Sequence, residues 1–479
     1  MAGSVYNIIN QKFKECLALE YNELIRKYPE FIYHGYDITE QDNGIKVVYH
    51  FETVGLTEFH PYWILPETGI DRNDLVFEEF IFSLGMVELV SYWKAACPPL
   101  VRVECGYLSD EQIEWWKKLY YHGLGEFFYT NGVDTDMKRF MTIETAGVER
   151  KRTVASKKKL SGCMIPVGGG KDSIVSLHVL SQYGNTQDNM CFMMNHRNSA
   201  FASALLAGYR PEDIYRPKRY LDRTIVELNK QGFLNGHTPL SALIAFAASM
   251  SAYICGKKYV ALSNESSANE ASVAGSDVNH QYSKSFEFEK DFAEYLNKFI
   301  PCGVKYFSLL RPLSEIQIAA IFAELKEYHP VFRSCNAGNA GTKFDTWCLD
   351  CSKCLFVVMI LSPFLSDDEI KDIFRINLLN SGSDKMKGYF EQLIGLHESK
   401  PFECVGSVDE INFAMCLAIS KRLARGDKLP YLLEYYMTTP AYQKYKDSPN
   451  IYADYFDEVN LIPEDMKQCV RDCAKSCKW

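Results

Sequence analysis

A glycine-rich turn carries the residue types that bind a phosphate chain. Residues 166–173, with the sequence PVGGGKDS, lie where an apolar strand pattern ends and an amphipathic helix pattern begins. Three successive glycines remove every Cβ atom from the turn, so backbone N–H groups can approach phosphates closely, and the helix N-terminus adds its dipole. Ser173 offers a hydroxyl donor, and Asp172 is suited to the Mg²⁺ that accompanies a nucleoside triphosphate. The turn therefore predicts a site for a triphosphate and its metal ion.

The same run excludes two common nucleotide motifs. A Walker A loop needs Gly at position 165, which is Ile165, and Ser or Thr at position 172, which is Asp172. A dinucleotide-binding loop would need its third glycine at position 173, which is Ser173. A turn without a ligand is the alternative, but such a turn needs only one or two glycines.

Four cysteines are spaced like the ligands of a metal ion. Cys335, Cys348, Cys351 and Cys354 follow the pattern C-x12-C-x2-C-x2-C. Closely spaced thiolates plus a fourth from an adjacent segment complete a tetrahedron, and four ligands without an open position make a structural zinc site. An iron–sulfur cluster and unliganded thiols are the alternatives.

Strands and helices alternate around these motifs. Four buried strands are expected at 162–167, 190–195, 258–263 and 304–310, separated by helices at 172–183, 240–255 and 283–299. A repeated order of strand, crossover helix and strand implies a parallel sheet covered on both faces. Before it, the first 155 residues mix strand patterns such as 45–51 with helix patterns such as 77–93 and 109–119.

Polar clusters follow the predicted strands, at the sheet edge where open α/β proteins place ligands. Taken singly, each side chain is better explained as a surface or helix-cap residue, so the evidence is their collective position. The clusters include Asn195, His196, Ser263, Asn264, Glu265, His237, His280, Tyr282 and Lys284. A basic patch that could receive an anionic substrate comprises Arg210, Arg216, Lys218, Arg219 and Arg223.

The composition is that of an ordinary globular protein. Of 479 residues, 47% are hydrophobic and 24% are charged, which excludes a largely disordered, collagen-like or coiled-coil chain. A net charge of −9 argues against generic nucleic-acid binding, because neutralising phosphates needs a broad basic surface. Since neither a signal peptide nor a membrane-span pattern is found, we expect a cytoplasmic protein without a membrane partner.

Cysteine usage agrees with that compartment. Sixteen cysteines exceed what packing needs, and clustered thiols in a reducing environment indicate metal ligation before disulfides. Near the C-terminus, Cys469, Cys473 and Cys477 repeat every four residues and share one helix face. Packing is the better explanation there, because three ligands on one helix cannot surround a metal unaided.

The chain is expected to contain three consecutive domains. Residues 149–159 hold like charges without apolar periodicity, which is typical of a solvated linker and less so of a polyphosphate or nucleic-acid patch. We predict an N-terminal α+β domain over 1–155, an α/β catalytic domain with the cysteine knuckle over 156–375, and a mainly helical region over 376–479.

Residues 168–173 resemble the Ser-Gly-Gly-x-Asp-Ser loop of the PP-loop ATP pyrophosphatases, which hold the β- and γ-phosphates there and release pyrophosphate while transferring AMP. Gly168 stands where that group has Ser, so one phosphate-binding hydroxyl is absent. A similar C-x8-C-x2-C-x2-C zinc site follows the loop in 7-cyano-7-deazaguanine synthases of the same group. The resemblance implies a PP-loop domain over 156–375 whose ATP-binding residues are Gly168, Gly169, Gly170, Lys171, Asp172, Ser173, Asn195, His196, Ser263 and Asn264.

Longer segments resemble the UDP-N-acetyl-α-D-muramoyl-L-alanyl-L-glutamate epimerase family over roughly the first 375 residues. They are GGGKDS, GFLNGHTPLSALIAF, LSNESSANE, VNHQYSKSFEFE, YHPVFRSC and WCLDCSKC, with ELVSYWKAACPP and GLGEFFYTNG nearer the N-terminus. That family inverts the terminal L-glutamate of a peptidoglycan precursor to D-glutamate, converts ATP to AMP and pyrophosphate, and requires Mg²⁺. The resemblance therefore implies an ATP-dependent isomerase whose partner is a small molecule, the UDP-muramoyl dipeptide.

An ATP site suits an epimerase because a proton α to an ionised carboxylate is very weakly acidic. Converting the carboxylate to an acyl-adenylate makes its carbonyl an electron sink, so a base of ordinary strength can remove the proton. Inversion needs an acid and a base on opposite faces, and the sequence leaves their assignment open among His237, His280, Tyr282, Lys284 and Glu265.

Two other functions stay open. One is another adenylating PP-loop enzyme, either nitrile-forming or tRNA-modifying. An enzyme that binds tRNA is expected to have a more basic surface than a net charge of −9 indicates. The other is a nucleotide-sensing or scaffold protein without turnover, against which the intact Asp172 and Ser173 argue.

Overall fold

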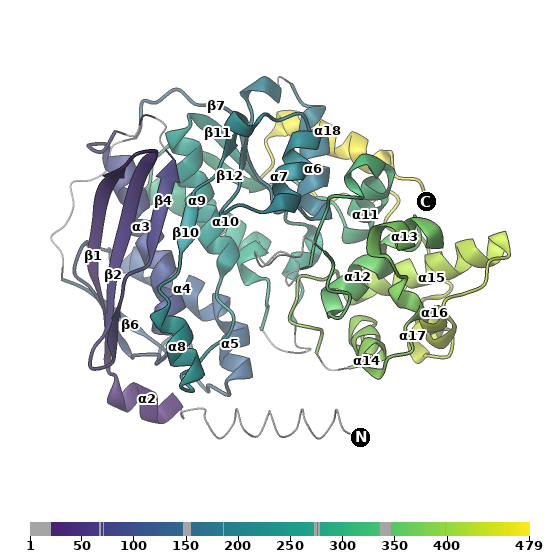
Figure 1. Ribbon diagram of the computed structural model, residues 1–479, viewed down its shortest axis with the longest axis horizontal. Helices are drawn as coiled ribbons and strands as arrows, with labels where there is room; N and C mark the ends of the chain where they lie inside the picture. Colours follow the sequence, from purple (N-terminus) through teal and green to yellow (C-terminus); the bar gives the residue numbers. More distant parts are fainter. Residues whose placement is uncertain are drawn as a thin grey trace. The chain divides into compact units, whose positions relative to one another are not determined.

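A computed structural model describes residues 21–66, 69, 71–146, 155–184, 186–272, 275, 278–335, 346–397 and 399–479 (Figure 1). Part of the predicted linker, 149–154, lies outside this range. The chain forms two compact units, each built from separated segments. Unit 1 comprises Met1–Ser156, Pro217–Met250 and Phe299–Pro301, and unit 2 comprises Lys157–Arg216, Ser251–Lys298 and Cys302–Trp479. The sequence predicts three domains that follow one another along the chain, whereas these two units are grouped by contacts between separated segments. The three domains therefore stay a prediction.

Unit 1 contains a mixed seven-stranded sheet in the order β10-β4-β2-β1-β5-β6, with β3 paired to β2. Its strands are β1 (Glu30–Gln41), β2 (Gly44–Thr53), β3 (Thr57–Phe59), β4 (Tyr62–Pro66), β5 (Leu100–Val103), β6 (Thr142–Thr145) and β10 (Lys218–Tyr220). Its helices include α2 (Tyr21–Lys27), α3 (Leu75–Trp93), α4 (Asp110–Gly123), α5 (Gly125–Thr130) and α8 (Thr224–Lys230). Alternate residues of β2 are buried, as expected of a strand with one face on the core. The predicted strand at 45–51 and helices at 77–93 and 109–119 are confirmed.

Unit 2 contains the predicted parallel sheet. Its order is β12-β11-β7-β8-β9, and every adjacent pair is parallel. The strands are β7 (Ser161–Pro166), β8 (Met190–Phe192), β9 (Ile214–Tyr215), β11 (Lys257–Leu262) and β12 (Lys305–Ser308). All four predicted strands are confirmed, although β8 ends three residues before the predicted end. The fifth strand, β9, was not predicted, because two residues are too short to show a pattern.

The helices that follow β7, β8, β11 and β12 are α6 (Lys171–Ser181), α7 (Asn198–Leu206), α10 (Phe286–Phe299) and α11 (Glu315–Glu324). Helix α9 (Leu240–Ile254) precedes β11 and lies mostly in unit 1. From β7 the chain builds outward through β8 to β9, and later through β11 to β12 on the other side. The strand order therefore reverses between β7 and β11. In open α/β sheets the crevice at the carboxyl ends of the strands beside such a reversal is where ligands bind.

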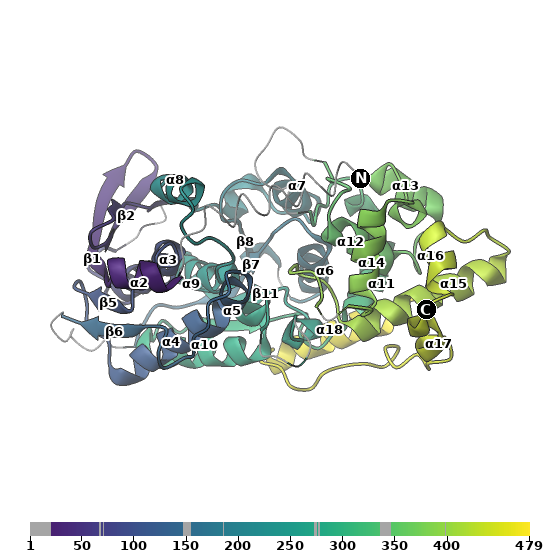
Figure 2. The same cartoon turned by 90° about the horizontal axis from the view of Figure 1, so that it is seen from below.

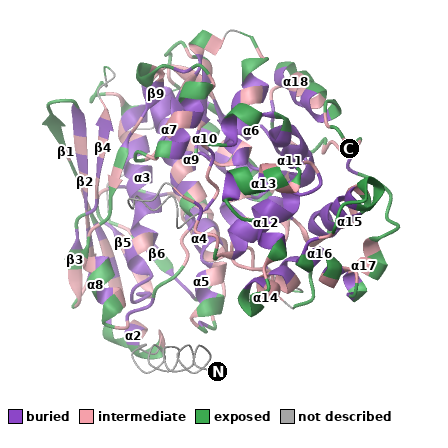
Figure 3. Cartoon of the chain, turned by 45° about the vertical axis from the view of Figure 1, so that its right-hand side comes forward, coloured by how far each residue is buried: buried purple, intermediate pink, exposed green. Residues whose placement is uncertain are grey.

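The C-terminal part of unit 2 is helical, as predicted for residues beyond 375. It contains α12 (Ser352–Leu361), α13 (Asp367–Phe374), α14 (Asp384–Leu393), α15 (Val408–Arg425), α16 (Tyr431–Tyr436), α17 (Pro440–Tyr445) and α18 (Glu464–Lys475). Every residue of α12 is buried, which makes it a central core element of the unit (Figure 3).

Helix α18 runs beside α6 and α11 (Figure 2). Cys473 is 3% exposed, and its Sγ lies 3.6 Å from Gln182 Oε1, while Cys477 Sγ lies 3.6 Å from the Gln317 carbonyl oxygen. This contact confirms that the cysteine repeat near the C-terminus serves packing. Among the described residues, no helix combines the length and the apolar character needed to cross a membrane.

Candidate active site

The glycine loop is closed in by protein on one side and open on the other. Gly169 has a φ of +82°, and a Cβ atom there would lie 2.4 Å from Ser199 Oγ and 2.6 Å from the backbone nitrogen of Ala200. A Cβ atom on Gly168 would meet no atom within 4 Å, and Gly168 is exposed. Only glycine fits at 169, because a side chain would be strained at this φ and would collide with the start of α7. The open side at Gly168 lets a ligand reach the backbone.

Ser173 holds the loop in shape. Its Oγ accepts a hydrogen bond from the Gly169 N–H (3.2 Å) and donates one to the Gly170 carbonyl oxygen (2.9 Å). Gly170 is the N-cap of α6 and provides no side-chain cap. The N–H groups at the start of α6 therefore have no side chain competing with a phosphate for them.

Lys171 is buried between two carboxylates. Its Nζ contacts Asp172 Oδ1 and lies 2.5 Å from Glu315 Oε1, and the residue is 1% exposed. Burial alone would lower the pKa of Lys171, but the two carboxylates outweigh burial and raise it, so Lys171 is positively charged. The phosphate contact predicted for Lys171 stays a prediction, since its Nζ already serves these carboxylates.

Asp172 and Glu315 offer the oxygen ligands that Mg²⁺ prefers. Both carboxylates touch the same Lys171 nitrogen, so they lie close together. Burial would raise the pKa of Asp172, but Lys171 and Lys353 lower it and keep the group ionised. Burial raises the pKa of Glu315 to about 8, with Lys171 acting against it. Asp172, 32% exposed, can present an oxygen to a magnesium ion, whereas Glu315 is buried and its raised pKa favours the protonated form until a cation binds.

Glu315 was not predicted, and α11 and α15 together position it. Ser314 caps α11, and the Glu315 N–H donates to Glu410 Oε1 at 2.6 Å. Glu410 in turn belongs to the capping box that starts α15 with Ser407. A buried carboxylate at a helix start gave no signal in the sequence, because its partners are distant in the chain: Lys171 lies 144 positions earlier and Glu410 lies 95 positions later.

A second charged cluster contains Lys284, Cys404, His280 and Lys353. Lys284 Nζ lies 2.9 Å from Cys404 Sγ, and Lys353 Nζ donates to the Cys404 carbonyl oxygen. His280 forms a side-chain hydrogen bond with the same thiol. Burial would lower the pKa of Lys284, but Cys404 and Glu265 outweigh it and raise the pKa. The structure thus brings two predicted residues, His280 and Lys284, to two that were not predicted, Lys353 and Cys404.

A buried ion pair fixes the backbone of the predicted polar clusters. Arg311 and Glu289 are 0% and 1% exposed, with 3.0 Å between Arg311 Nη2 and Glu289 Oε2. Arg311 also donates to the carbonyl oxygens of Glu265 (2.6 Å) and Lys284. The segments after β11 and before α10 are therefore tied to one guanidinium group, whose planar donors suit several acceptors at once.

The polar residues after β11 lie at the strand reversal. Asn264 Nδ2 donates to Ser308 Oγ at 3.0 Å, at the end of β12. Ser263 Oγ accepts a 2.8 Å hydrogen bond from Ser176, which lies on α6 behind the glycine loop. Ser263 and Asn264 therefore lie at the sheet edge where they were predicted. Their contact with ATP stays a prediction.

Asn195 and His196 follow β8 and are both exposed. Asn195 has a φ of +60°, and His196 Nε2 lies 2.9 Å from Asn198 Oδ1 at the start of α7. The strand that they follow pairs with β7, so they lie at the same edge of the sheet as the loop. Their exposure leaves them accessible to a ligand.

The other two acid–base candidates have different surroundings. His237 belongs to unit 1, where its Nδ1 lies 3.6 Å from Glu126 Oε2. Lys94 holds the preceding residue in place through a 2.5 Å bond to the Gly236 carbonyl oxygen, and burial lowers the pKa of Lys94 to about 8. Tyr282 is 6% exposed, and burial raises its pKa well above its usual range, so its phenol is neutral.

The predicted metal ligands come together. The sulfur atoms of Cys335, Cys348, Cys351 and Cys354 all lie within 4.8 Å of one another, and 3.6 Å separates those of Cys348 and Cys354. Zinc–sulfur bonds of about 2.3 Å in a tetrahedron place sulfur atoms about 3.8 Å apart, so the four thiols fit a zinc ion. Cys351 also caps α12 by accepting from the Cys354 N–H.

The predicted basic patch consists partly of paired groups. Arg210 bonds Asp213 at 2.9 Å, and Arg219 bonds the fully buried Glu88 at 2.6 Å. Both arginines are therefore already paired with carboxylates of the protein.

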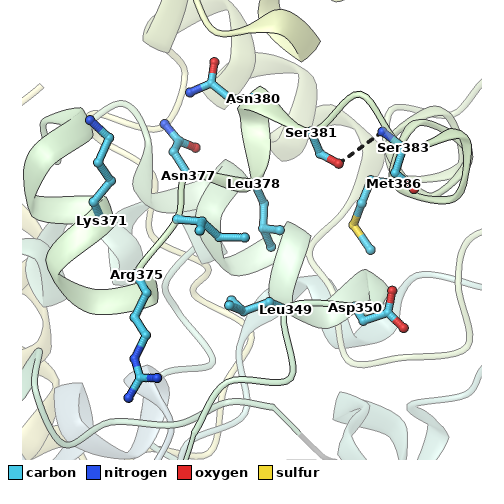
Figure 4. Close-up of a pocket in the computed structure, with 11 residues that line it drawn as sticks. Leu349, Asp350, Lys371, Arg375, Asn377, Leu378, Asn380, Ser381, Ser383 and Met386 are labelled. Atoms are coloured by element: carbon cyan, nitrogen blue, oxygen red, sulfur yellow. Dashed lines mark hydrogen bonds between the residues drawn. The ribbon is translucent and has the colours of Figure 1, made fainter.

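A surface pocket of about 510 Å³ lies elsewhere in unit 2 (Figure 4). Its walls come from α13, α14 and the segment between them, with Leu349 and Asp350 from the cysteine knuckle. None of the predicted ATP or acid–base residues is in this lining. Lys371 and Asp350, two of its charged groups, are paired with Asp368 and Lys385.

Comparison with known proteins identifies the family. Models of the MurL N-terminal domain and the MurL C-terminal domain match residues 22–309 and 331–444. The chain belongs to the MurL family. The N-terminal MurL model includes most of unit 1 together with the glycine loop, and the C-terminal MurL model includes all four clustered cysteines, Lys353 and Cys404.

Three relatives carry the same name, UDP-N-acetyl-alpha-D-muramoyl-L-alanyl-L-glutamate epimerase. The Micromonospora sp. protein is 34% identical over 83% of this chain and 88% of its own length. The Xanthomonas oryzae pv. oryzae protein is 32% identical over 73% of this chain and 76% of its own length, and the Salinispora tropica protein is 34% identical over 70% and 72%. No solved structure matched the chain.

Proposed function

We propose that this protein is an ATP-dependent epimerase that inverts the terminal L-glutamate of UDP-N-acetylmuramoyl-L-alanyl-L-glutamate to D-glutamate in peptidoglycan precursor synthesis. The observation that carries the proposal is the agreement between family and site. Relatives covering most of the chain have this epimerase name, and the glycine loop lies at the strand reversal where α/β proteins bind nucleotides.

The glycine loop is the proposed PP-loop and ATP site. The exposed backbone at Gly168 and the uncapped start of α6 would hold the β- and γ-phosphates of ATP. Asp172 and Glu315 would hold Mg²⁺, which would neutralise phosphate charge. Asn195, His196, Ser263 and Asn264 lie at the same sheet edge and would contact the nucleotide.

Activation precedes inversion in this proposal. The glutamate carboxylate attacks the α-phosphorus of ATP, a carboxylate–phosphorus bond forms, and pyrophosphate leaves. The acyl-adenylate then loses its α-proton to one group and regains a proton on the other face, and hydrolysis gives product and AMP. His280, Lys284 and Glu265 surround the charged cluster of unit 2, while His237 comes from unit 1, so all four stay proton-transfer candidates. The neutral Tyr282 would act only as an acid or a hydrogen-bond donor.

The cysteine cluster is proposed to bind structural zinc. Its ligands Cys351 and Cys354 flank Lys353 at the start of α12, and Lys353 reaches Cys404. Zinc at this position would fix a cation beside the site without taking part in the reaction.

The function is tested by incubating the protein with ATP, Mg²⁺ and UDP-N-acetylmuramoyl-L-alanyl-L-glutamate in D₂O. We expect D-glutamate after hydrolysis, deuterium at its α-carbon, and AMP with pyrophosphate but no ADP; without ATP, neither inversion nor exchange should occur. Asp172→Asn and Ser173→Ala should each lower the rate at least ~100-fold while the fold persists. If pyrophosphate forms while the α-hydrogen and the configuration stay unchanged, the protein is a different adenylating enzyme. If ADP and phosphate accumulate, the adenylation mechanism is wrong.

A further inference from the structure

Cys404 lies in a short segment between α14 and α15 that is pinned to the site. The Lys400 N–H donates to the Ser272 carbonyl oxygen (3.0 Å) on one side of it. On the other side, a Cβ atom added to Gly406 would lie 3.1 Å from Glu315 Cγ, so the segment packs directly against the carboxylate that pairs with Lys171. The thiol is thus held next to the proposed ATP site by backbone contacts.

Three neighbouring side chains, Lys284, His280 and Lys353, favour the ionised form of this thiol. Lys284 Nζ lies 2.9 Å from Sγ, His280 hydrogen-bonds the sulfur, and Lys353 contributes a third positive charge. Burial would raise the pKa of Cys404, but Lys284, the hydrogen bond from His280 and Lys353 outweigh it and lower the pKa to about 6. Among the described cysteines whose pKa is shifted, the others shift upward, for which burial is the usual cause.

A partly exposed thiolate among lysines is suited to take a proton from carbon. The sulfur is basic only when ionised, and neighbouring cations also stabilise the negative charge that develops on the carbonyl oxygen of the substrate. The structure supplies both conditions at one place, with Lys284 in contact with the sulfur and within electrostatic reach of Asp172.

We propose that Cys404 is a catalytic proton-transfer residue that serves one face of the glutamate α-carbon, an inference that rests on the epimerase function proposed above. In one direction the α-C–H bond breaks, an S–H bond forms at Cys404, and the electron pair moves into the activated carbonyl as an enolate. A second group protonates the other face, and in the reverse direction the two groups exchange roles. His280 binds the same sulfur and therefore belongs to the same face, which leaves the opposite face to another residue.

The decisive experiment measures exchange separately with the L- and D-epimers of the substrate, in D₂O with ATP and Mg²⁺. Cys404→Ala should still form pyrophosphate from both epimers but should invert at least ~100-fold more slowly. It should exchange the α-hydrogen of only one epimer, because the remaining group can remove and return a proton on its own face only. Cys404→Ser, which keeps the shape without an accessible anion, should behave in the same way.

Cys255→Ala is the matched control. Cys255 is also a half-buried thiol of unit 2 near lysines, but burial raises its pKa to about 11. It should invert like the wild type. Inversion by Cys404→Ala or Cys404→Ser within threefold of the wild type would overturn the assignment. Loss of exchange from both epimers, or loss of pyrophosphate formation by a folded variant, would equally refute a role confined to one face.

A second readout does not depend on turnover. In the native protein, carbamidomethylation of Cys404 by iodoacetamide should rise with pH to a half-maximum near 6, since its pKa is lowered to about 6 from an ordinary value of 9. Peptide mass spectrometry would locate the label, and Lys284→Met should shift the half-maximum upward. A half-maximum near 9 would contradict the thiolate. If the wild type itself does not invert its substrate, the proposed function fails; if it does and only the Cys404 variants are unaffected, this inference alone fails.

Discussion

Gly168 and Gly169 are neighbours in the loop but meet different constraints. Gly169 adopts a left-handed conformation against the start of α7, whereas Gly168 faces open space. Sequence alone treats them alike, because both are glycines in one run. The structure assigns Gly169 to the shape of the loop and Gly168 to its exposed surface.

The first prediction follows from this difference. Gly169→Ala should destabilise the protein by about 1–3 kcal/mol or more, because an L side chain is strained at positive φ and its Cβ would collide with Ser199 and Ala200. Gly168→Ala should leave the free energy of unfolding within about 0.5 kcal/mol of the wild type. Urea unfolding of the two variants checks this. Equal stability of the two variants would contradict the loop geometry described here.

The paired experiment on binding uses the same variants. A methyl group at 168 would occupy the space through which a phosphate approaches, so Gly168→Ala should weaken ATP binding while the fold persists. Titration calorimetry with a non-hydrolysable ATP analogue and Mg²⁺ measures the affinity. Unchanged affinity would place the phosphates away from Gly168.

At the scale of elements, the start of α12 joins the cysteine cluster to the charged site. Cys351 and Cys354 hold the first turn of the helix, and Lys353 between them contacts Cys404. All of α12 is buried, and its N-terminal end carries Cys351 and Cys354. Binding of a metal ion by these cysteines would therefore affect the position of α12 at that end. A metal ion there would organise the site through Lys353.

Metal removal tests this connection. Elemental analysis should find about one zinc per chain, as a closed four-thiolate site implies. Cys348→Ser should lower both zinc content and stability, and Lys353→Met should lower activity while keeping the zinc. Lys385→Met, a change on an exposed lysine that pairs with Asp350 near the knuckle, is the control and should alter neither. Iron in place of zinc, or a metal-free active protein, would refute the zinc assignment.

At the scale of the whole molecule, the charged site of unit 2 is assembled from segments far apart in the chain. Asp172 follows β7, Lys284 precedes α10, Glu315 begins α11 and Cys404 precedes α15. A ligand that contacts several of these segments should therefore stabilise the folded unit as a whole, since only the native state presents them together.

Ligand stabilisation gives the corresponding prediction. An ATP analogue with Mg²⁺ at 100 times its Kd should stabilise the wild type by about 2.7 kcal/mol. Asp172→Asn should lose most of this gain, whereas the Cys255→Ala control should retain it. Thermal unfolding with and without the ligand measures the effect. An equal shift in Asp172→Asn would exclude Asp172 from the binding site.

Local patterns in the sequence determined much of this protein. The strand patterns at 162–167, 190–195, 258–263 and 304–310 predict the parallel sheet, and the cysteine spacing predicts a cluster that the structure brings within 4.8 Å. Both features depend on residues that are close together in the chain. A run of apolar residues predicts a buried strand, and the short spacing of the cysteines predicts a metal-binding loop. The glycine run likewise predicts a turn at its own position, because the conformational freedom of glycine does not depend on distant residues.

The tertiary structure alone decided which charges meet. Lys171 pairs with Glu315, 144 residues later, and Lys284 meets Cys404, 120 residues later. The Arg311–Glu289 pair and the contact of Lys353 with Cys404 likewise have no local signature. Burial shifts a pKa only once the surrounding groups are in place, so the low pKa of Cys404 is a property of the fold. Sequence thus indicated a phosphate loop, and packing across the sheet edge supplied the charged groups around it.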